Sequence, residues 1–239
     1  MTRIEHEIEH GKKLKTNAES IWGWSSPVGI SRANRRASYY AQLGNWNKES
    51  NLLEIGCGTG LFTRKVYSTT QANITAIDIS EDLLEIARDL LPQANFKQAD
   101  AMHLEFKDDF FDGVYGSSVL HHLDMEKSLK EIYRVLKPQG RIVFAEPNML
   151  NPQIFIQKNI PFIKRLAGDS PDETAVVRWK MVALLKQLGF KKARVFPYDF
   201  LHPITPKPLI NIVSEISKAL EQLPLIKEIA GSHIIYAEK

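Results

Sequence analysis

The sequence predicts an α/β protein built on a doubly wound, mostly parallel sheet. From residue 51 onward, short apolar runs that suit buried strands alternate with amphipathic segments that suit helices. A cluster of glycines follows the first of these runs, and an aspartate ends the second. Helices that alternate with strands return the chain to the same edge of the sheet, so the strands they connect run parallel.

The elements follow from the spacing of apolar residues and from their boundary signals. Ser80 is expected to cap a helix that carries Glu81 and Asp82 in its first turn, where acidic groups suit the helix dipole. Pro138 and Gly140 end the next amphipathic helix. Strands are predicted over residues 51–55, 73–78, 95–98, 111–116, 141–145, 191–196 and 232–238, and helices over 61–67, 81–88, 125–136, 174–188 and 206–223.

The chain divides into a cap and a main domain. Residues 1–48 are expected to form an N-terminal helical cap or lid, interrupted by an aromatic segment, and residues 49–239 form the sheet domain. The aromatic residues of the cap would equally form a small core that joins it to the sheet. Two apolar inserts, residues 147–173 and 200–230, follow the fifth and sixth strands, on the side where doubly wound sheets bind ligands.

Composition excludes several classes of protein. The single cysteine, Cys57, rules out an intramolecular disulfide framework and a multi-cysteine metal cluster, so a reduced, cytoplasmic setting is expected. No apolar run reaches the roughly 18 residues that a membrane span needs. The net charge of +3 is too small to indicate a nucleic-acid partner. Residues 151–239 carry 13 basic and 8 acidic side chains, which would attract an acidic substrate or a membrane surface, or form solvated faces.

The strongest motif is the glycine loop after the first strand, where Gly56, Gly58 and Gly60 alternate with other residues. Glycines there allow a tight turn and a close approach of ligand to backbone. Asp78 ends the next strand, where a carboxylate accepts hydrogen bonds from both ribose hydroxyls of an adenosine. Leu61 stands where the nicotinamide fingerprint has its third glycine, and no Gly-Lys-Ser/Thr sequence follows, which excludes a P-loop.

These residues and three later segments, 100–102, 111–123 and 136–148, resemble the motifs of class I S-adenosylmethionine-dependent methyltransferases of the small-molecule, type 11-like group. The resemblance is strong over about residues 50–146. It implies a Rossmann-like, seven-stranded sheet, mostly parallel with an antiparallel last strand. It also implies S-adenosylmethionine as methyl donor, S-adenosylhomocysteine as product, and no metal ion.

The same resemblance implies a set of donor-binding residues. The glycine loop matches the family's first motif, Asp78 matches the acid that holds the ribose, and residues 100–102 match the segment that recognises adenine. Cys57 is expected to be a small filler within the loop. One of three arginines, Arg32, Arg35 or Arg36, is expected to meet the methionine carboxylate of the donor. The full set is Glu54, Gly56, Cys57, Gly58, Gly60, Asp78, Ile79, Asp100, Ala101, Met102 and Ser117.

Methyl transfer from a sulfonium is an in-line displacement, so the protein mainly brings the acceptor close and aligned. A base is needed only where the acceptor must lose a proton. Candidates for that base or for acceptor binding lie near the predicted ends of strands, and they are His121, His122, Glu146 and His202. Candidate acceptor contacts are Trp22, Trp24, Tyr39, Tyr40 and Asn148.

We therefore expect methyl transfer to a small, partly hydrophobic acceptor bound by the two inserts, with oxygen as the first choice of atom and nitrogen or carbon as alternatives. Residues 116–119, Gly-Ser-Ser-Val, lack the Pro-Pro motif of base-amino methyltransferases, and Ser117 replaces the acid of catechol-type enzymes. Three alternatives stay open: a peptide or protein acceptor, a membrane lipid met through residues 206–223, and a non-catalytic partner protein that binds the donor. A nicotinamide oxidoreductase is a more distant alternative.

Overall fold

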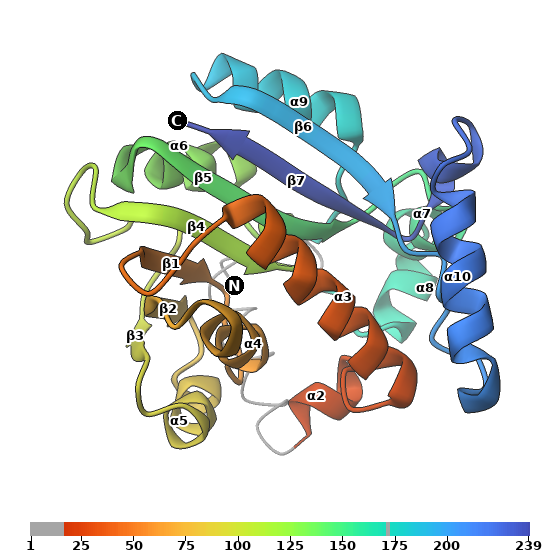
Figure 1. The fold of residues 1–239 in the computed structure, drawn as a ribbon. Helices are drawn as coiled ribbons and strands as arrows, with labels where there is room; N and C mark the ends of the chain where they lie inside the picture. Colours follow the sequence, from red (N-terminus) through yellow and green to blue (C-terminus); the bar gives the residue numbers. More distant parts are fainter. Residues whose placement is uncertain (1–16, 171–172) are drawn as a thin grey trace.

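The computed structural model describes residues 17–170 and 173–239. Over these residues, seven strands form one sheet in the order β3-β2-β1-β4-β5-β7-β6 (Figure 1). The strands are β1 Asn51–Ile55, β2 Asn73–Asp78, β3 Asn95–Gln98, β4 Phe111–Ser117, β5 Leu136–Pro147, β6 Lys191–Tyr198 and β7 Ser232–Glu238.

The sheet confirms the fold expected from the sequence. Strands β1 to β5 pair in parallel, and β7 lies antiparallel between β5 and β6. The order reverses at β1, which pairs with β2 on one side and with β4 on the other. A doubly wound sheet binds ligands at such a switch point, beyond the carboxyl ends of the strands.

Helices cover both faces of the sheet (Figure 1). The α-helices are α2 Ala18–Ile21, α3 Pro27–Gly44, α4 Leu61–Thr70, α5 Glu81–Leu90, α6 Met125–Val135, α7 Pro152–Asn159, α8 Pro161–Leu166, α9 Arg178–Gln187 and α10 Ile210–Leu220. Three 3-10 turns accompany them, η1 Leu120–His122, η2 Lys207–Leu209 and η3 Ile226–Ile229. No helix in the described part of the chain combines the length and apolar character needed to cross a bilayer.

Alternate residues of the central strands enter two separate cores. Leu52 and Tyr115 pack on the face covered by α3, α4 and α5, together with Phe62. Leu53 and Val114 point to the opposite face, which α6 and α9 cover. This alternation follows from the two-residue period of a strand, and burial on both faces explains why these strands are mostly apolar.

The predicted start of α9 and the predicted length of the last long helix differ from those in the structure. Residues 174–177 are not helical, because the Val176 amide donates to the Pro147 carbonyl at 2.9 Å and ties this segment to the end of β5. The helix expected over 206–223 begins as η2, where the Leu209 amide donates to Pro206 three residues earlier. Helix α10 ends at Leu220, shortly before Pro224, which cannot continue it.

The boundary between α6 and β5 also differs from the prediction. The helix ends at Val135, and β5 starts at Leu136 rather than at Arg141. Leu136 pairs with Phe111 of β4, and the register then shifts before the regular ladder resumes. The predicted stop at Pro138 and Gly140 is therefore an irregular part of a long strand.

Candidate functional site

A cavity of about 530 Å³ opens at the carboxyl edge of the sheet. Ile55, Asp78, Ser117 and Pro147 are the last residues of β1, β2, β4 and β5, and all four line it. Its volume is that of a small-molecule site, for which roughly 300–1,000 Å³ is usual. Of the eleven predicted donor-binding residues, nine line this cavity: Gly56, Cys57, Gly58, Asp78, Ile79, Asp100, Ala101, Met102 and Ser117.

The glycine loop forms one wall of the cavity, and its backbone needs glycine. Gly56 and Gly58 have φ values of +66° and +52°, a left-handed conformation that side chains disfavour. A Cβ at Gly56 would come within 2.4 Å of Val119, and one at Gly58 within 3.0 Å of Trp22. The loop therefore presents bare backbone to whatever the cavity binds.

Two carboxylates, those of Asp78 and Asp100, line the same cavity as the loop. Asp78 accepts a hydrogen bond from the Gly58 amide at 2.8 Å and another from the Ser80 amide at 2.9 Å. Burial raises the pKa of the Asp78 carboxyl, and these amides oppose the rise. Ser80 stands at the N-cap of α5, but its hydroxyl makes no capping bond. Asp100 accepts from the Met102 amide at 2.8 Å, which shapes the turn after β3.

Glu54 and Gly60 lie behind the cavity rather than on its wall. Glu54 is buried and accepts a hydrogen bond from the Tyr115 hydroxyl at 2.9 Å. Burial raises the pKa of its carboxyl to about 8. Gly60, with φ +76°, starts α4. Burial also raises the pKa of the Cys57 thiol, so it stays protonated, in keeping with a filler.

The three arginines of α3 have different partners. Arg32 pairs with Asp199 at 2.6 Å, and Arg35 pairs with Glu221 at 2.5 Å. Arg36 is buried, and its hydrogen bonds go to the hydroxyls of Ser117, Ser118 and Tyr198 at 2.6, 3.0 and 3.0 Å. Because Arg36 lines the cavity and has no ion pair with a carboxylate among the described residues, it is the arginine suited to an anionic ligand group.

His121 lines the cavity, and Glu146 holds it from behind. Nδ1 of His121 lies 2.7 Å from one carboxylate oxygen of Glu146. The other oxygen accepts from the amides of Val119 and Leu120, both at 2.9 Å. Burial lowers the pKa of His121. Burial alone would raise the pKa of Glu146, but the bonds from His121 and the two amides lower it overall.

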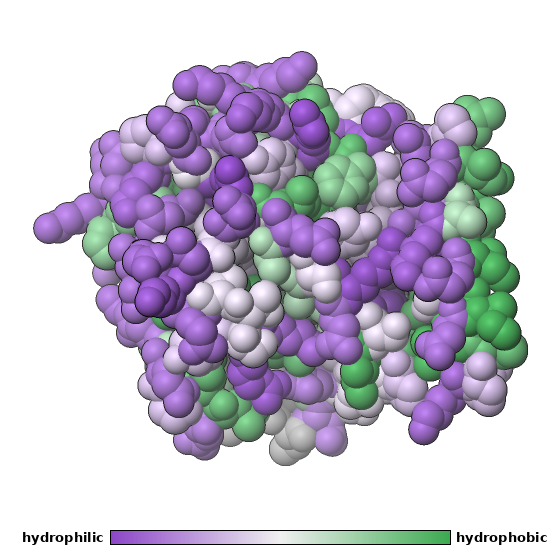
Figure 2. All heavy atoms as spheres, in the orientation of Figure 1, coloured by the Kyte–Doolittle hydropathy of each residue, from purple (hydrophilic) through white to green (hydrophobic). Residues whose placement is uncertain are grey.

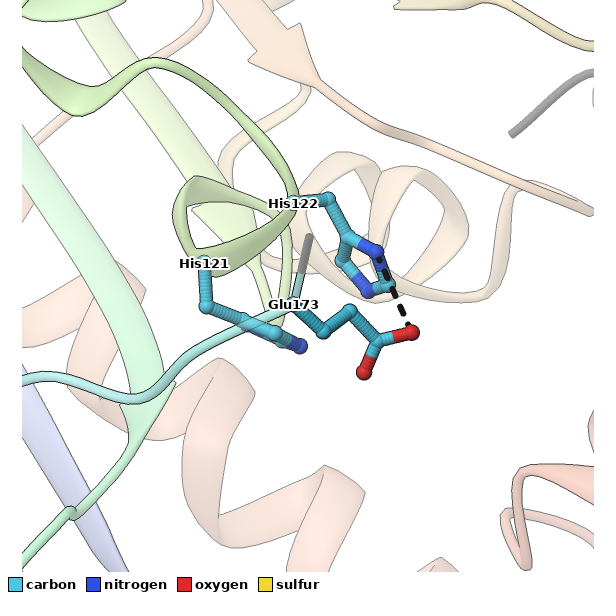
Figure 3. A group of neighbouring side chains, drawn as sticks. All are labelled: His121, His122 and Glu173. Atoms are coloured by element: carbon cyan, nitrogen blue, oxygen red, sulfur yellow. Dashed lines mark ion pairs between the residues drawn. The ribbon is translucent and has the colours of Figure 1, made fainter. Parts of the chain in front are cut away.

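His122 belongs to a second group of charged side chains (Figure 3). Nδ1 of His122 lies 3.6 Å from one carboxylate oxygen of Glu173. The other oxygen of Glu173 forms an ion pair with Nζ of Lys158 at 2.5 Å. Lys158 also pairs with Asp169 at 2.9 Å. Burial would raise the pKa of Glu173, but His122 and Lys158 lower it to about 2.

The ring nitrogens of His121 and His122 and a Glu173 oxygen lie within 4.8 Å of one another, as the ligands of a divalent cation do. Sequence spacing could not suggest this set, because Glu173 lies 51 residues beyond His122. Lys158 already supplies a positive charge to Glu173, so a metal ion here would have to displace it. The arrangement fits an ion-paired wall of the cavity better than a metal centre.

The predicted acceptor contacts and candidate bases lie in different places relative to the cavity. Trp22 and Trp24 line the cavity, but Tyr39 and Tyr40 pack beneath α3 against Tyr198 and Tyr115. Glu146, Asn148 and His202 do not line the cavity either. Glu146 is buried behind His121, and Asn148 is buried and donates hydrogen bonds to the carbonyls of Glu228 and Ala230. His202 is exposed, and its ring forms a hydrogen bond with Gln153 at 2.8 Å.

Comparison with known proteins agrees with this site. A model of the methyltransferase domain matches residues 53–144. An uncharacterised methyltransferase of Schizosaccharomyces pombe is 31% identical over 194 residues, which cover 77% of this chain and 75% of that protein. An O-methyltransferase of Penicillium expansum is 40% identical over 148 residues, or 59% of this chain, and the match spans only 52% of that relative.

Solved structures show the same fold. The crystal structure of a S-adenosylmethionine-dependent methyltransferase from Archaeoglobus fulgidus matches with a TM-score of 0.63 and 21% identity, over 88% of this chain and 94% of the other. The yeast relative exceeds 30% identity over about three quarters of both chains. The residues matched by the methyltransferase domain, 53–144, include the glycine loop, Asp78 and Asp100. The chain therefore belongs to the class I S-adenosylmethionine-dependent methyltransferases.

Proposed function

We propose that this enzyme methylates a hydroxyl group of a small, partly hydrophobic acceptor, with His121 as the general base. The observation that carries the proposal is the His121–Glu146 pair, which opens on the same cavity as the glycine loop and Asp78. A histidine oriented by a carboxylate is suited to take a proton from a hydroxyl group.

The cavity fits the methyl donor of the family. We assign the ribose to Asp78, the adenine to residues 100–102 and the methionine carboxylate to Arg36. The buried Arg36 guanidinium, bonded to hydroxyls, supports the last assignment, because a carboxylate would complete its charge pairing. When bound, S-adenosylmethionine supplies a methyl group activated by the sulfonium charge.

The protonation state of His121 suits a base. Its lowered pKa keeps the ring neutral at neutral pH. Glu146, ionised because of its three hydrogen bonds, accepts a hydrogen bond from Nδ1–H of His121, so the lone pair of Nε2 is left for the proton of the acceptor hydroxyl. Glu146 is then a positioning residue, and His122 is the alternative base, with Glu173 as its partner.

The walls of the remaining cavity suggest the character of the acceptor. Trp22 and Trp24 line the cavity from the N-terminal segment, which we propose to act as a cap. Ile154 lines it from the insert of residues 147–173. Aromatic and aliphatic side chains favour an acceptor with apolar surface. The O-methyltransferase of Penicillium expansum, a relative by sequence, supports oxygen as the methylated atom.

A labelling experiment tests the proposal. The enzyme is incubated with S-adenosylmethionine carrying a labelled methyl group and a cell extract, which is then separated into metabolites, lipids, protein and nucleic acid. We expect label in a small apolar molecule, bound through oxygen and dependent on His121. Label in protein or nucleic acid, or on nitrogen or carbon, would contradict the acceptor assignment. Donor binding without any turnover would favour a non-catalytic partner protein.

A further inference from the structure

Large apolar side chains are concentrated on one edge of the molecule. Over α7, α8 and residues 204–229, many of them are open to solvent, and Figure 2 shows them as a green band along α10. We call the exposed apolar side chains of residues 155–166 and 204–229 the apolar edge. Its most exposed members are Leu225, Ile204, Leu166, Phe162, Ile212 and Phe155, with exposed fractions of 87, 82, 77, 71, 60 and 53%. Scattered exposed apolar residues are ordinary, but a cluster of this size marks an interaction site.

Specific contacts join these segments into one surface. The side-chain amide of Asn151, at the start of α7, donates to the Ile229 carbonyl of η3 at 2.8 Å. Gln153, also at the start of α7, bonds His202 at 2.8 Å, just before Ile204. These two bonds tie the start of α7 to η3 and to the segment that leads to α10, and Figure 1 draws α7, α8 and α10 toward the same edge of the molecule.

The charges around the apolar edge are mostly positive. Residues 152–168 and 202–229 hold six lysines and arginines against three glutamates. The Lys158 side chain is only 7% exposed and pairs with Asp169 and Glu173, so five of the six contribute to this surface. Two of these glutamates, Glu221 and Glu228, already pair with arginines of other elements, Arg35 and Arg178. The third, Glu215, pairs with Lys218. Apolar side chains with basic neighbours are the pattern of helices that lie in the interface of an anionic bilayer.

We propose that the apolar edge docks this methyltransferase on an anionic membrane surface. The basic side chains meet lipid phosphates, and the apolar side chains enter the boundary between headgroups and acyl chains. Helix α7 connects this surface to the reaction site, because Ile154, Gln157 and Lys158 line the cavity while Phe155 points to solvent. Where the proposed function also holds, a hydrophobic acceptor dissolved in the bilayer reaches the cavity beside α7.

Co-sedimentation with lipid vesicles tests the docking. The full chain is mixed with vesicles of equal parts phosphatidylcholine and phosphatidylglycerol, or of phosphatidylcholine alone. We expect binding to the anionic vesicles that weakens in high salt and without phosphatidylglycerol. The double variant Phe162→Gln, Leu225→Gln should bind at least about tenfold more weakly, because two large apolar groups no longer leave water. Leu90→Gln is the matched control, since Leu90 is 45% exposed on α5, outside the apolar edge, and should bind as wild type does.

Three results would overturn the docking proposal. The first is that the wild type sediments with neither kind of vesicle. The second is that the double variant and the wild type sediment equally with the anionic vesicles. The third is a dimer in analytical ultracentrifugation that the double variant breaks, which would assign the apolar edge to a second copy of the chain. Calorimetry with S-adenosylhomocysteine should give unchanged binding for the double variant, which shows that its site is folded. Vesicle binding without methylation of any hydroxyl would refute the proposed function and leave the docking intact.

Discussion

The side chains of His121 and Glu146 join the turn after β4 to the end of β5 by a hydrogen bond of 2.7 Å. Because the second oxygen of Glu146 accepts from two backbone amides, this carboxylate cannot swing toward the cavity without leaving them unpaired. The imidazole is therefore held in one orientation, with Nδ1 directed at Glu146. The orientation of this histidine is thus set by a residue near the end of β5.

Replacing His121 should remove the base. We expect His121→Ala to lower the rate of methyl transfer at saturating donor by about 10²–10⁴-fold, the usual contribution of a positioned base. In the wild type, the rate should fall as the pH drops below the lowered pKa of His121, because the protonated ring accepts no proton. The variant should lack this acidic limb. The matched change His122→Ala should keep the limb, and the reverse pattern would identify His122 as the base.

Glu146→Gln tests the positioning role. The amide keeps an oxygen for the amides of Val119 and Leu120, so its nitrogen faces Nδ1 of His121 and donates to it. The ring proton then moves to Nε2, and the base is lost. We expect kcat to fall about as far as in His121→Ala, with KM for the donor unchanged. Glu146 raises the pKa of His121, so any residual acidic limb should move to lower pH. An unchanged kcat in Glu146→Gln would exclude the proposed role of Glu146 in positioning His121 as the base.

Arg36 should recognise the amino-acid end of the donor. We expect Arg36→Lys to weaken binding of S-adenosylhomocysteine by roughly 10–100-fold, the value of one charged hydrogen-bonding group. Binding of 5′-methylthioadenosine, which lacks the carboxylate, should be unaffected. Calorimetry with both ligands makes the comparison. Arg35→Lys is the control, because Arg35 pairs with Glu221 and does not line the cavity. Equal losses for the two ligands would refute the assignment.

Asp78 is expected to hold the ribose. Asp78→Ala should weaken binding of S-adenosylhomocysteine by roughly 10²-fold, because two charge-assisted hydrogen bonds are lost. Asp112 offers a control at the other end of the sheet, where it accepts from the Asn51 amide at 2.8 Å and pairs with Lys137. Asp112→Ala should lower the melting temperature and leave ligand affinity unchanged. Unaltered affinity in Asp78→Ala would overturn the ribose assignment.

The buried Glu54 should make stability depend on pH. Its pKa of about 8 in the folded state exceeds the ordinary value of 4.5, so between these values only the folded state holds the proton. The contribution of Glu54 to the free energy of unfolding is therefore fully present below pH 4.5 and is lost as the pH rises through about 8. Glu54→Gln has no proton to lose, and its stability relative to wild type should rise over this interval in denaturant titrations. A constant difference would show that Glu54 is ionised in the folded protein.

Much of the sheet and of the donor site was predictable, because both depend on local signals. The bounds of β1, β2 and β7 agree with the apolar runs, since these runs are mostly buried and end in polar or glycine residues. The bounds of β3 agree as well, although only Phe96 of this edge strand is buried. The glycine loop and Asp78 belong to one strand–helix–strand unit, in which the loop follows β1, α4 comes next, and Asp78 ends β2. Parallel pairing then brings the ends of β1 and β2 to the same edge.

The rest of the site depends on contacts that no local pattern encodes. Lys158, Asp169 and Glu173 come from the insert, and folding brings Glu173, the partner of Lys158, next to His122 of the turn after β4. Residues 174–177 were predicted to be helical. They are not helical, because β5 reaches Pro147 and the Val176 amide donates a hydrogen bond to the Pro147 carbonyl. Tyr39 and Tyr40 were expected near the acceptor, yet α3 turns them toward the core, where aromatic contacts stabilise them.

The position of β7 affects the order in which the protein forms during synthesis. Strand β6 pairs with β7 and not with β5, although β6 leaves the ribosome about forty residues before β7. The nascent chain can close β1 to β5 and the glycine loop first, but β6 has no partner strand until residues 232–238 emerge. Arg32 and Arg35 of α3 likewise wait for Asp199 and Glu221. Translation past residue 232 is thus the step that converts a half-built sheet, with an exposed edge at β5, into the finished enzyme.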